Sequence, residues 1–432
     1  MENQKQKHYS KSLADSRFGG WGWSMIIWAL FSYFFFAGIT TDLQNVIPSA
    51  FAATYGMDSN QLLAFATPAS LVGIVGGFIF ARLLLKVSTK KLSAIALLIT
   101  GVLFAILGYC SNPIVYLIVF TAIQFIFAAV QFAAPTLMAE WFPRKKGVAL
   151  GWATIGAPLS TAALVPIFSA LVGLWGVRVA CLILGIAIVV YGIATIFWMK
   201  DKPQDVGAYP DNMPPEVEAE VAKQANQETI MEADHYTIGM ILKHPNTWLI
   251  SIGFGMLWMV TSGIASQMVP RMMSVGYTSS EGLMFLTVSS IIAMPGSYFW
   301  GWLDSKIGTK ITSVIYSVCY IVALVLLIFA SSEALIWIAC VFVGLGLGGL
   351  LNLIPSMVIT AFGKDGFRQA NSVITTIATI IRALAFYIMS ALLTASGGSY
   401  TLPYLVFIGI EVVGAIVLLC IRGKKKETKK AE

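Results

Sequence analysis

Gly301-Trp-Leu-Asp-Ser-Lys-Ile-Gly-Thr-Lys310 is the second of two related ten-residue segments in this chain. The first is Gly77-Phe-Ile-Phe-Ala-Arg-Leu-Leu-Leu-Lys86. In both, a glycine, a base and a second base stand at the same spacing, and a long apolar run comes before them. Glycine and bases are common in the loops of any membrane protein, but that alone does not explain the matched spacing. We therefore predict that the chain contains two repeats of one structural unit.

The composition indicates a membrane protein. Hydrophobic residues make up 57% of the 432 positions and charged residues 11%, and the mean hydropathy is +0.79. A soluble domain carries roughly 25% charged residues. The apolar runs are long enough to cross a bilayer as helices. We predict an all-α membrane protein with twelve transmembrane helices in two pseudo-symmetric six-helix halves. The predicted spans are 24–53, 60–82, 91–110, 113–138, 147–173, 176–199, 246–270, 281–303, 309–330, 333–361, 368–395 and 401–421.

The distribution of basic residues predicts the orientation. With both termini in the cytoplasm, all but three of the 28 Lys and Arg residues fall in cytoplasmic segments, as the positive-inside rule requires. The exceptions are Arg178 and Arg271, near outer ends of spans, and Arg382 within a span. We expect a multi-pass protein of the cell membrane, with its net charge of +7 attracted to lipid headgroups. A nucleic-acid partner is not expected, because the bases are spread over seven short segments.

The same pattern predicts the domain boundaries. The first apolar run is too long for a signal peptide and lacks a small-residue cleavage site. A charge run at Glu216–Asp234 predicts a short amphipathic helix in a flexible linker. The predicted parts are a cytoplasmic N-terminus (1–23), an N-terminal half (24–199), a cytoplasmic linker (200–245), a C-terminal half (246–422) and a basic tail (423–432).

Several kinds of site are not expected. The five cysteines are scattered without a CxxC pair, and the three histidines lie outside the predicted spans. We therefore expect no disulfide framework, no metal site, no cofactor and no intramembrane histidine relay. No Ser/His/Asp set is present, so an enzyme is not expected. The glycine run Gly344–Gly349 and the pair Gly147 and Gly151 predict close helix packing rather than a dinucleotide site.

Arg382 stands alone in the apolar run ITTIATIIRALAFYIMSALL (374–393), and no other charge lies between Arg368 and Glu411. An arginine at the centre of a membrane span costs about 2.5–3.5 kcal/mol on insertion scales. We expect it in a water-filled cavity or an ion pair, where its planar fork can bind a carboxylate through two hydrogen bonds. The alternative is a structural pair with Glu411, which the depths of the two residues in their spans also allow.

The two ten-residue segments resemble the 2–3 and 8–9 loops of the major facilitator superfamily, with the pattern G-x-L-x-D-[RK]-x-G-[RK]-[RK]. The second copy has its acid, Asp304, one position early, and the first has Ala81 in place of the acid. The resemblance covers essentially all twelve spans. It implies transport by alternating access, a substrate site near the midplane between the halves, and a gating role for the loop residues Arg82, Asp304 and Lys306.

A finer resemblance comes from Glu140-Trp-Phe-Pro-Arg-Lys-Lys-Gly-Val-Ala-Leu-Gly151, from Gly156-Ala-Pro158, and from the segment 200–211. These are similar to the oxalate/formate exchanger and monocarboxylate porter group. That group places a base in span eleven, where Arg382 stands, and typically a second in span eight. Span eight has no charge here, so a monocarboxylate fits better than a dianion such as oxalate.

The resemblance thus implies a monomeric transporter of a small organic carboxylate anion, driven by proton symport or by exchange for a counter-anion. One alternative is a bulkier amphipathic acid, such as a bile or aromatic acid, which the aromatic run Phe31 to Phe36 would suit. A membrane solute sensor on the same scaffold is the other alternative.

Further polar residues in the spans are candidates for the site. Asp42, at the end of the first aromatic span, is the candidate proton-coupling group; its alternative is a carboxylate at the outer interface. Intramembrane amides often hold helices together instead of binding ligands, and Gln124 is a weaker candidate of this kind. The substrate-binding candidates besides Arg382 are Tyr33, Gln131, Gln267 and Asn352.

Overall fold

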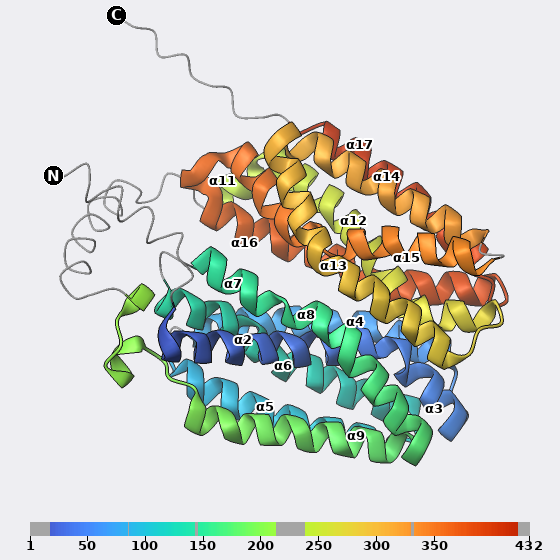
Figure 1. Cartoon of the computed structure of the whole chain (residues 1–432), viewed down its shortest axis with the longest axis horizontal. Coiled ribbons are helices and arrows are strands. Elements are labelled where there is room, and N and C mark those ends of the chain that lie inside the picture. Colours follow the sequence, from blue (N-terminus) through green and yellow to red (C-terminus); the bar gives the residue numbers. More distant parts are fainter. Residues whose placement is uncertain (1–17, 85, 143–145, 213–237, 330–331, 422–432) are drawn as a thin grey trace, which may run out of the picture. The chain divides into compact units, whose positions relative to one another are not determined.

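The computed structural model describes residues 18–84, 86–142, 146–212, 238–329 and 332–421, without the side chains of 146–147 and 363–369. Every regular element in these ranges is a helix (Figure 1), which confirms the predicted all-α class. Ten helices in the described ranges are long and apolar enough to cross a membrane. The number is eleven if the bent pair Glu333–Leu347 and Leu350–Phe362 forms one span.

With the bent pair counted as one span, one long segment accounts for the remaining difference between eleven and the predicted twelve spans. Val148–Trp198 is counted once but has 51 residues, about 77 Å at 1.5 Å per residue. The hydrocarbon core of a bilayer is only about 30 Å thick. Inside this segment Gly176 leaves helical geometry, with φ 78° and ψ 168°. The segment therefore makes two crossings, which correspond to the predicted spans 147–173 and 176–199.

The chain divides into two compact units. The first holds the chain up to residue 231 except for 44–49 and 58–68, and the second holds those two segments and the remainder. The helices up to residue 198 are α2 (Gly19–Thr40), η1 (Asp42–Asn45), α3 (Ile47–Tyr55), α4 (Ser59–Leu83), α5 (Thr89–Leu107), α6 (Pro113–Trp141), α7 (Lys146–Thr154), α8 (Gly156–Leu159), the π-helical turn Ser160–Leu164 and α9 (Val165–Trp198).

The later helices belong to the second unit. They are α11 (Ile238–Lys243), α12 (Pro245–Ser274), α13 (Ser279–Ile307), α14 (Thr309–Ile328), α15 (Glu333–Leu347), α16 (Leu350–Ala395) and α17 (Thr401–Leu419). Between the two series the described chain forms only short 3₁₀ turns, Pro203–Val206 and Pro210–Asn212. The predicted helix at Glu216–Asp234 lies outside the described residues.

Helix starts follow local signals in the sequence. The side chain of Ser88 accepts a hydrogen bond from the backbone of Lys91 at the start of α5. At the start of α13, Thr278 and Glu281 form a capping box in which each side chain bonds the other's backbone. Such caps satisfy amide groups that have no partner within the helix, and they fix where these membrane helices begin.

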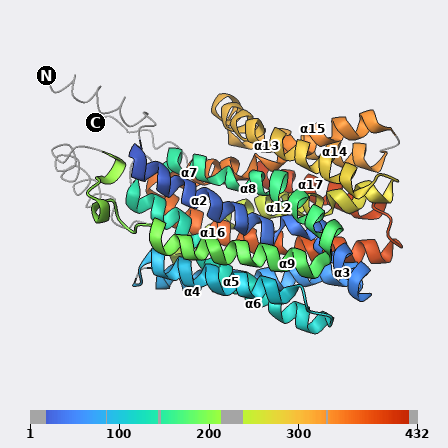
Figure 2. The ribbon, with the colours of Figure 1, turned by 60° about the horizontal axis from the view of Figure 1, so that its bottom comes forward.

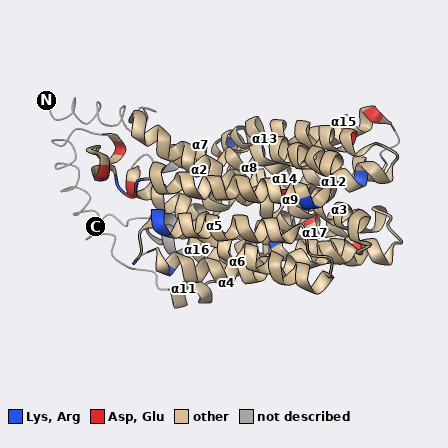
Figure 3. Cartoon of the chain, turned by 90° about the horizontal axis from the view of Figure 1, so that it is seen from below, with Lys and Arg blue, Asp and Glu red and all other residues tan. Residues whose placement is uncertain are grey.

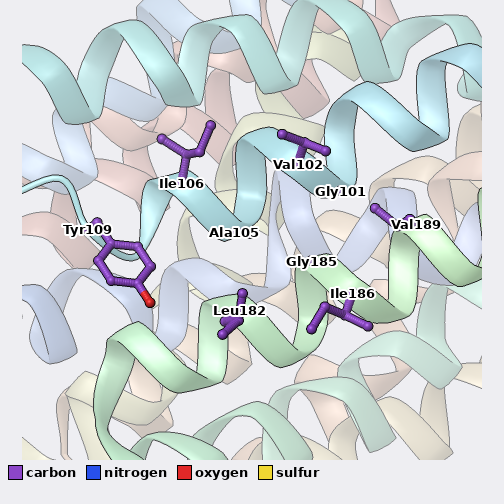
Figure 4. A pocket seen from close by; sticks show the side chains of 9 residues that line it. All are labelled: Gly101, Val102, Ala105, Ile106, Tyr109, Leu182, Gly185, Ile186 and Val189. Carbon is purple, nitrogen blue, oxygen red and sulfur yellow. The ribbon is translucent and has the colours of Figure 1, made fainter.

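In the first unit, α5 packs along α6 and α9 (Figure 2). Gly101 and Gly185 meet at the α5–α9 contact, where a Cβ on either would lie 2.6 Å from the other's carbonyl oxygen. Small residues at such contacts let membrane helices approach closely. Beside them is a shallow apolar groove (Figure 4), and its residues Val102 and Ile186 are each 53% exposed. The groove therefore faces lipid.

In the second unit, the predicted packing role of the glycine run is confirmed. A Cβ on Gly344 would lie 2.5 Å from the carbonyl oxygen of Ser289, and one on Gly346 would overlap the ring of Tyr320. The predicted packing role of Gly151 was wrong, because nothing lies within 4 Å of a Cβ there. Charged side chains are sparse along the described helices of both units (Figure 3), so the few that occur within spans need a specific explanation.

Candidate functional site

Arg382 projects from α16 against one face of α12. Its Nε donates a hydrogen bond to Ser262 Oγ at 2.7 Å, and its guanidinium carbon lies 4.9 Å from the ring centroid of Trp258. A guanidinium over an indole ring is a favourable cation–π contact. Ser262 is buried, while Arg382 and Trp258 are half-buried. The guanidinium is thus held in place from one side and remains partly accessible.

Sequence reasoning missed Trp258 and Ser262. They are four residues apart on α12, so they lie on the same helix face one turn apart. The signal in the sequence is a tryptophan followed four residues later by a serine within the predicted span 246–270. Together they hold the guanidinium of Arg382 against α12.

The pair between Arg382 and Glu411 is not formed. Glu411 lies on α17 and is fully buried, and within the described part of the chain neither of its carboxyl oxygens has a hydrogen-bond partner. Its neighbours are Tyr316, Ser317 and Tyr320 of α14. Arg382 is therefore held by α12, whereas Glu411 faces α14.

Two predicted ligands in the second unit make helix-to-helix contacts. Gln267 of α12 accepts a hydrogen bond from the Tyr400 hydroxyl at 2.9 Å. Asn352 of α16 donates to the carbonyl oxygen and to the Oγ of Ser297 on α13, both at 2.9 Å. These bonds are of the kind that holds membrane helices together. Contact of either residue with a substrate stays a prediction.

The remaining candidates belong to the first unit. Tyr33 on α2 and Gln131 on α6 are half-buried, and Gln124 donates to the carbonyl oxygen of Thr40 at 3.3 Å. Asp42 follows the end of α2, is only 9% exposed and accepts a hydrogen bond from Thr161 at 3.0 Å.

The setting of Asp42 is unusual, because Thr161 lies in the π-helical turn Ser160–Leu164. Turns of this kind often occur at functional sites. Asp42 is thus enclosed by protein and hydrogen-bonded. Its role in proton coupling stays a prediction.

The loop residues show how the two repeats differ. In the second unit, Asp304 at the end of α13 accepts a hydrogen bond from Ser356 of α16 at 2.5 Å. Ser356 also bonds the Thr309 hydroxyl at the start of α14, at 3.1 Å. Lys306 is exposed. One carboxylate therefore links three helices at this end.

In the first unit, where Ala81 replaces the acid, Asp201 supplies a carboxylate from beyond the end of α9. It accepts hydrogen bonds from the Lys90 backbone at 2.7 Å and from Ser88 Oγ at 2.5 Å. Arg82 is exposed. Asp201 was not among the predicted residues; its position next to Lys200 and Lys202, opposite the base-rich start of α5, is the available signal.

Comparison with known proteins agrees with this architecture. The family model of the Major Facilitator Superfamily matches residues 26–386. The chain is 23% identical over 202 residues to an oxalate:formate antiporter of Oxalobacter formigenes. That match covers 45% of this chain and 42% of the antiporter, so it spans less than half of either protein.

Solved structures match over nearly the whole chain. The nucleoside transporter NupG is 13% identical, with a TM-score of 0.71 over 93% of this chain and 99% of NupG. A D-xylose-proton symporter is also 13% identical, with a TM-score of 0.66 over 94% and 98%. A bacterial homologue of the lysosomal transporter Spinster is 14% identical, with a TM-score of 0.66 over 92% and 93%. These likenesses concern the fold. With the family match over most of its length, the chain belongs to the Major Facilitator Superfamily and is a multi-pass membrane transporter.

Proposed function

We propose that the protein moves a small organic monocarboxylate across the membrane by alternating access, by proton symport or by anion exchange. The observation that carries the proposal is Arg382, a cation in the middle of an apolar span that Trp258 and Ser262 hold in one orientation. A guanidinium in a low-dielectric site is matched by an anion that its fork can bind through two hydrogen bonds. The partial likeness to an oxalate:formate antiporter supports a carboxylate.

The charge balance supports a monoanion. Span eight, now seen as the apolar part of α13 between Gly282 and Trp302, carries no charged residue. A dianion bound to one arginine would bring an uncompensated negative charge out of water, which costs several kcal/mol. A monocarboxylate leaves the site neutral.

The aromatic run in α2 gives no separate support for a bulkier acid. Phe31 and Phe34 contact each other with ring centroids 6.2 Å apart, and Phe35 lies 5.4 Å from Tyr191 of α9. These rings pack against one another within the first unit. We therefore retain the small carboxylate as the proposed substrate.

Counterflow in proteoliposomes tests the proposed function. Vesicles that contain the purified protein are loaded with unlabelled formate, acetate, lactate, oxalate, a bile acid, xylose or a nucleoside, and entry of the same compound in labelled form is measured. We expect counterflow with at least one monocarboxylate and none with xylose or the nucleoside. Counterflow with the bile acid alone would identify the bulkier substrate, and none with any acid would contradict the proposal.

A second test concerns Trp258. Trp258→Ala removes the ring beneath the guanidinium, and cation–π contacts contribute about 0.5–2 kcal/mol. We expect the KM of counterflow to rise about 2- to 30-fold, as that energy implies, and Trp258→Phe to recover part of the loss. Trp302→Ala is the matched control, because Trp302 is 48% exposed on α13. Equal KM values for the Trp258 and Trp302 variants would show that the ring does not orient the arginine.

A further inference from the structure

Glu411 is a carboxyl group enclosed in the second unit without a partner. Its side chain is 0% exposed, and neither of its oxygens has a hydrogen-bond partner among the residues that the structure describes. It lies on α17, which packs against α12, α14 and α16. On the same helix Val412 and Val413 are 42% and 47% exposed, so Glu411 is on the inward face and its neighbours are on the outward face.

The described bases on the packed helices are engaged elsewhere. Arg271 of α12 lies over the rings of Tyr400 and Tyr404 and donates to the carbonyl oxygen of Leu327. Lys310 of α14 donates to the carbonyl oxygen of Ile421. Arg382 of α16 is held by α12. Glu411 thus has no described cation as its partner.

The groups that do face Glu411 are hydroxyls. Tyr316, Ser317 and Tyr320 line it from α14, and α14 also contributes the thiol of Cys319 near Tyr316. Ser317 Oγ and the Tyr320 hydroxyl, like the carboxyl itself, have no hydrogen-bond partner. The Ser317 and Tyr320 hydroxyls can each donate to a carboxylate or accept from a carboxylic acid, whereas the Tyr316 hydroxyl already donates to the Gly346 carbonyl oxygen. The pocket can therefore accommodate either protonation state after small side-chain rotations.

Electrostatics decides which state this conformation holds. An ionised carboxylate taken out of water without a cation costs several kcal/mol, and such a group takes up a proton instead. Intramembrane acids of this kind mark ion pathways and proton relays. Asp42, by contrast, accepts a hydrogen bond from Thr161. Of the two acids, Glu411 is the better placed to store a proton.

The Glu411 pocket connects to the arginine through one turn of α12. The hydroxyl of Tyr316 lies 3.0 Å from Thr261 Oγ1, and the next residue, Ser262, accepts the hydrogen bond from Arg382. A shift of this turn when an anion engages Arg382 would change the contacts of both Thr261 and Ser262. The two sites are therefore mechanically linked although Arg382 and Glu411 do not touch.

We propose that Glu411, with Tyr316, Ser317 and Tyr320, is the proton-binding site of this transporter. A hydronium ion transfers its proton to one carboxylate oxygen: an O–H bond of the hydronium breaks, the O–H bond of the carboxylic acid forms, and water is left behind. The proton leaves, with the bonding electrons staying on the carboxylate, when the pocket opens to the other side. Proton binding here accompanies anion binding at Arg382 and makes transport a symport. The inference rests on the proposed function only for the identity of the anion.

The test compares Glu411→Gln, a neutral isostere, with Glu333→Gln, which changes an exposed acid at the start of α15, in proteoliposomes. Exchange needs no net proton movement, so Glu411→Gln should retain counterflow of the labelled monocarboxylate. It should lose accumulation driven by a pH gradient and the accompanying proton uptake seen with an entrapped pH dye. Glu333→Gln should keep both, and loss of accumulation in Asp42→Asn but not in Glu411→Gln would overturn the inference. Pure exchange without proton uptake by the wild-type protein, or wild-type accumulation by Glu411→Gln, would overturn the inference.

An infrared measurement separates this inference from the substrate proposal. The C=O band of a protonated carboxylic acid should be present in the purified wild-type protein and in Glu333→Gln, and absent in Glu411→Gln. Loss of this band only in Glu411→Gln, even if no carboxylate shows counterflow in the wild-type protein, would support the proton site while the proposed function fails. An unchanged band in Glu411→Gln would overturn the proton site.

Discussion

Arg382→Ala is expected to weaken binding of the carboxylate about 10- to 150-fold while the protein still inserts and folds. The estimate follows from the 1.5–3 kcal/mol that a hydrogen bond to a charged group contributes. Arg382→Lys should recover only part of the loss, because an ammonium keeps the charge but not the planar fork. The KM of counterflow in proteoliposomes and the affinity in detergent solution measure both effects.

Two further variants make this prediction specific. Arg271→Ala removes the cation over Tyr400 and Tyr404, so it should lower thermal stability and leave the KM near that of the wild type. Adding Glu411→Gln to Arg382→Ala should not restore transport, because the two residues are not partners in this structure. Restored transport in the double variant would mean that Arg382 is a brace for α17 and that the anion is bound elsewhere.

The helices could be predicted from the sequence because each helix that crosses the lipid needs a run of about twenty apolar residues. Apolar runs of membrane length correspond to the observed helices, and the repeat around Gly77 and Gly301 corresponds to the family match. Helix continuity was harder to predict. The break predicted between spans 147–173 and 176–199 is present at Gly176, but α16 runs from Leu350 to Ala395 across the predicted boundary between spans 333–361 and 368–395.

The site was predicted less completely, for a geometric reason. Distance along a helix follows from residue number, so the sequence predicts a comparable depth for Arg382 and Glu411 in their spans. The direction in which a side chain points around the axis depends on an amphipathic pattern, and α17 is apolar on every face except at Glu411. Sequence therefore allowed a pair that the structure does not form. Trp258 and Ser262 escaped notice because neither carries a charge.

In the first copy of the loop motif, the missing acid is replaced by a carboxylate from a distant part of the chain, which the motif alone does not predict. The first copy has no acid at Ala81, yet the start of α5 still receives a carboxylate from Asp201, more than a hundred residues later in the chain. The second copy keeps its own acid, Asp304, which reaches α14 through Ser356. The physical requirement at both places is an acceptor for donors at a helix start, and the chain meets it by different routes.

Gly346→Ala is expected to destabilise the second unit strongly. An added Cβ would overlap the ring of Tyr320 on α14, and the neighbouring Tyr316 donates a hydrogen bond to the Gly346 carbonyl oxygen at 2.9 Å. Overpacking of a well-packed interior typically costs about 1–3 kcal/mol. Both tyrosines line Glu411, so the same change should also disturb pH-driven accumulation. Thermal unfolding in detergent, followed with a dye that reacts with newly exposed thiols such as buried Cys340, measures the stability loss.

Gly409→Ala is the matched control for this prediction. Gly409 lies on α17 with nothing within 4 Å of an added Cβ, and alanine has the higher helix propensity by about 1 kcal/mol. The melting temperature should therefore rise slightly or stay constant in Gly409→Ala and fall by several degrees in Gly346→Ala. Equal melting temperatures would show that the Tyr320 ring can move aside without cost. The close contact between α14 and α15 at Gly346 would then not fix the position of the Tyr320 hydroxyl near Glu411.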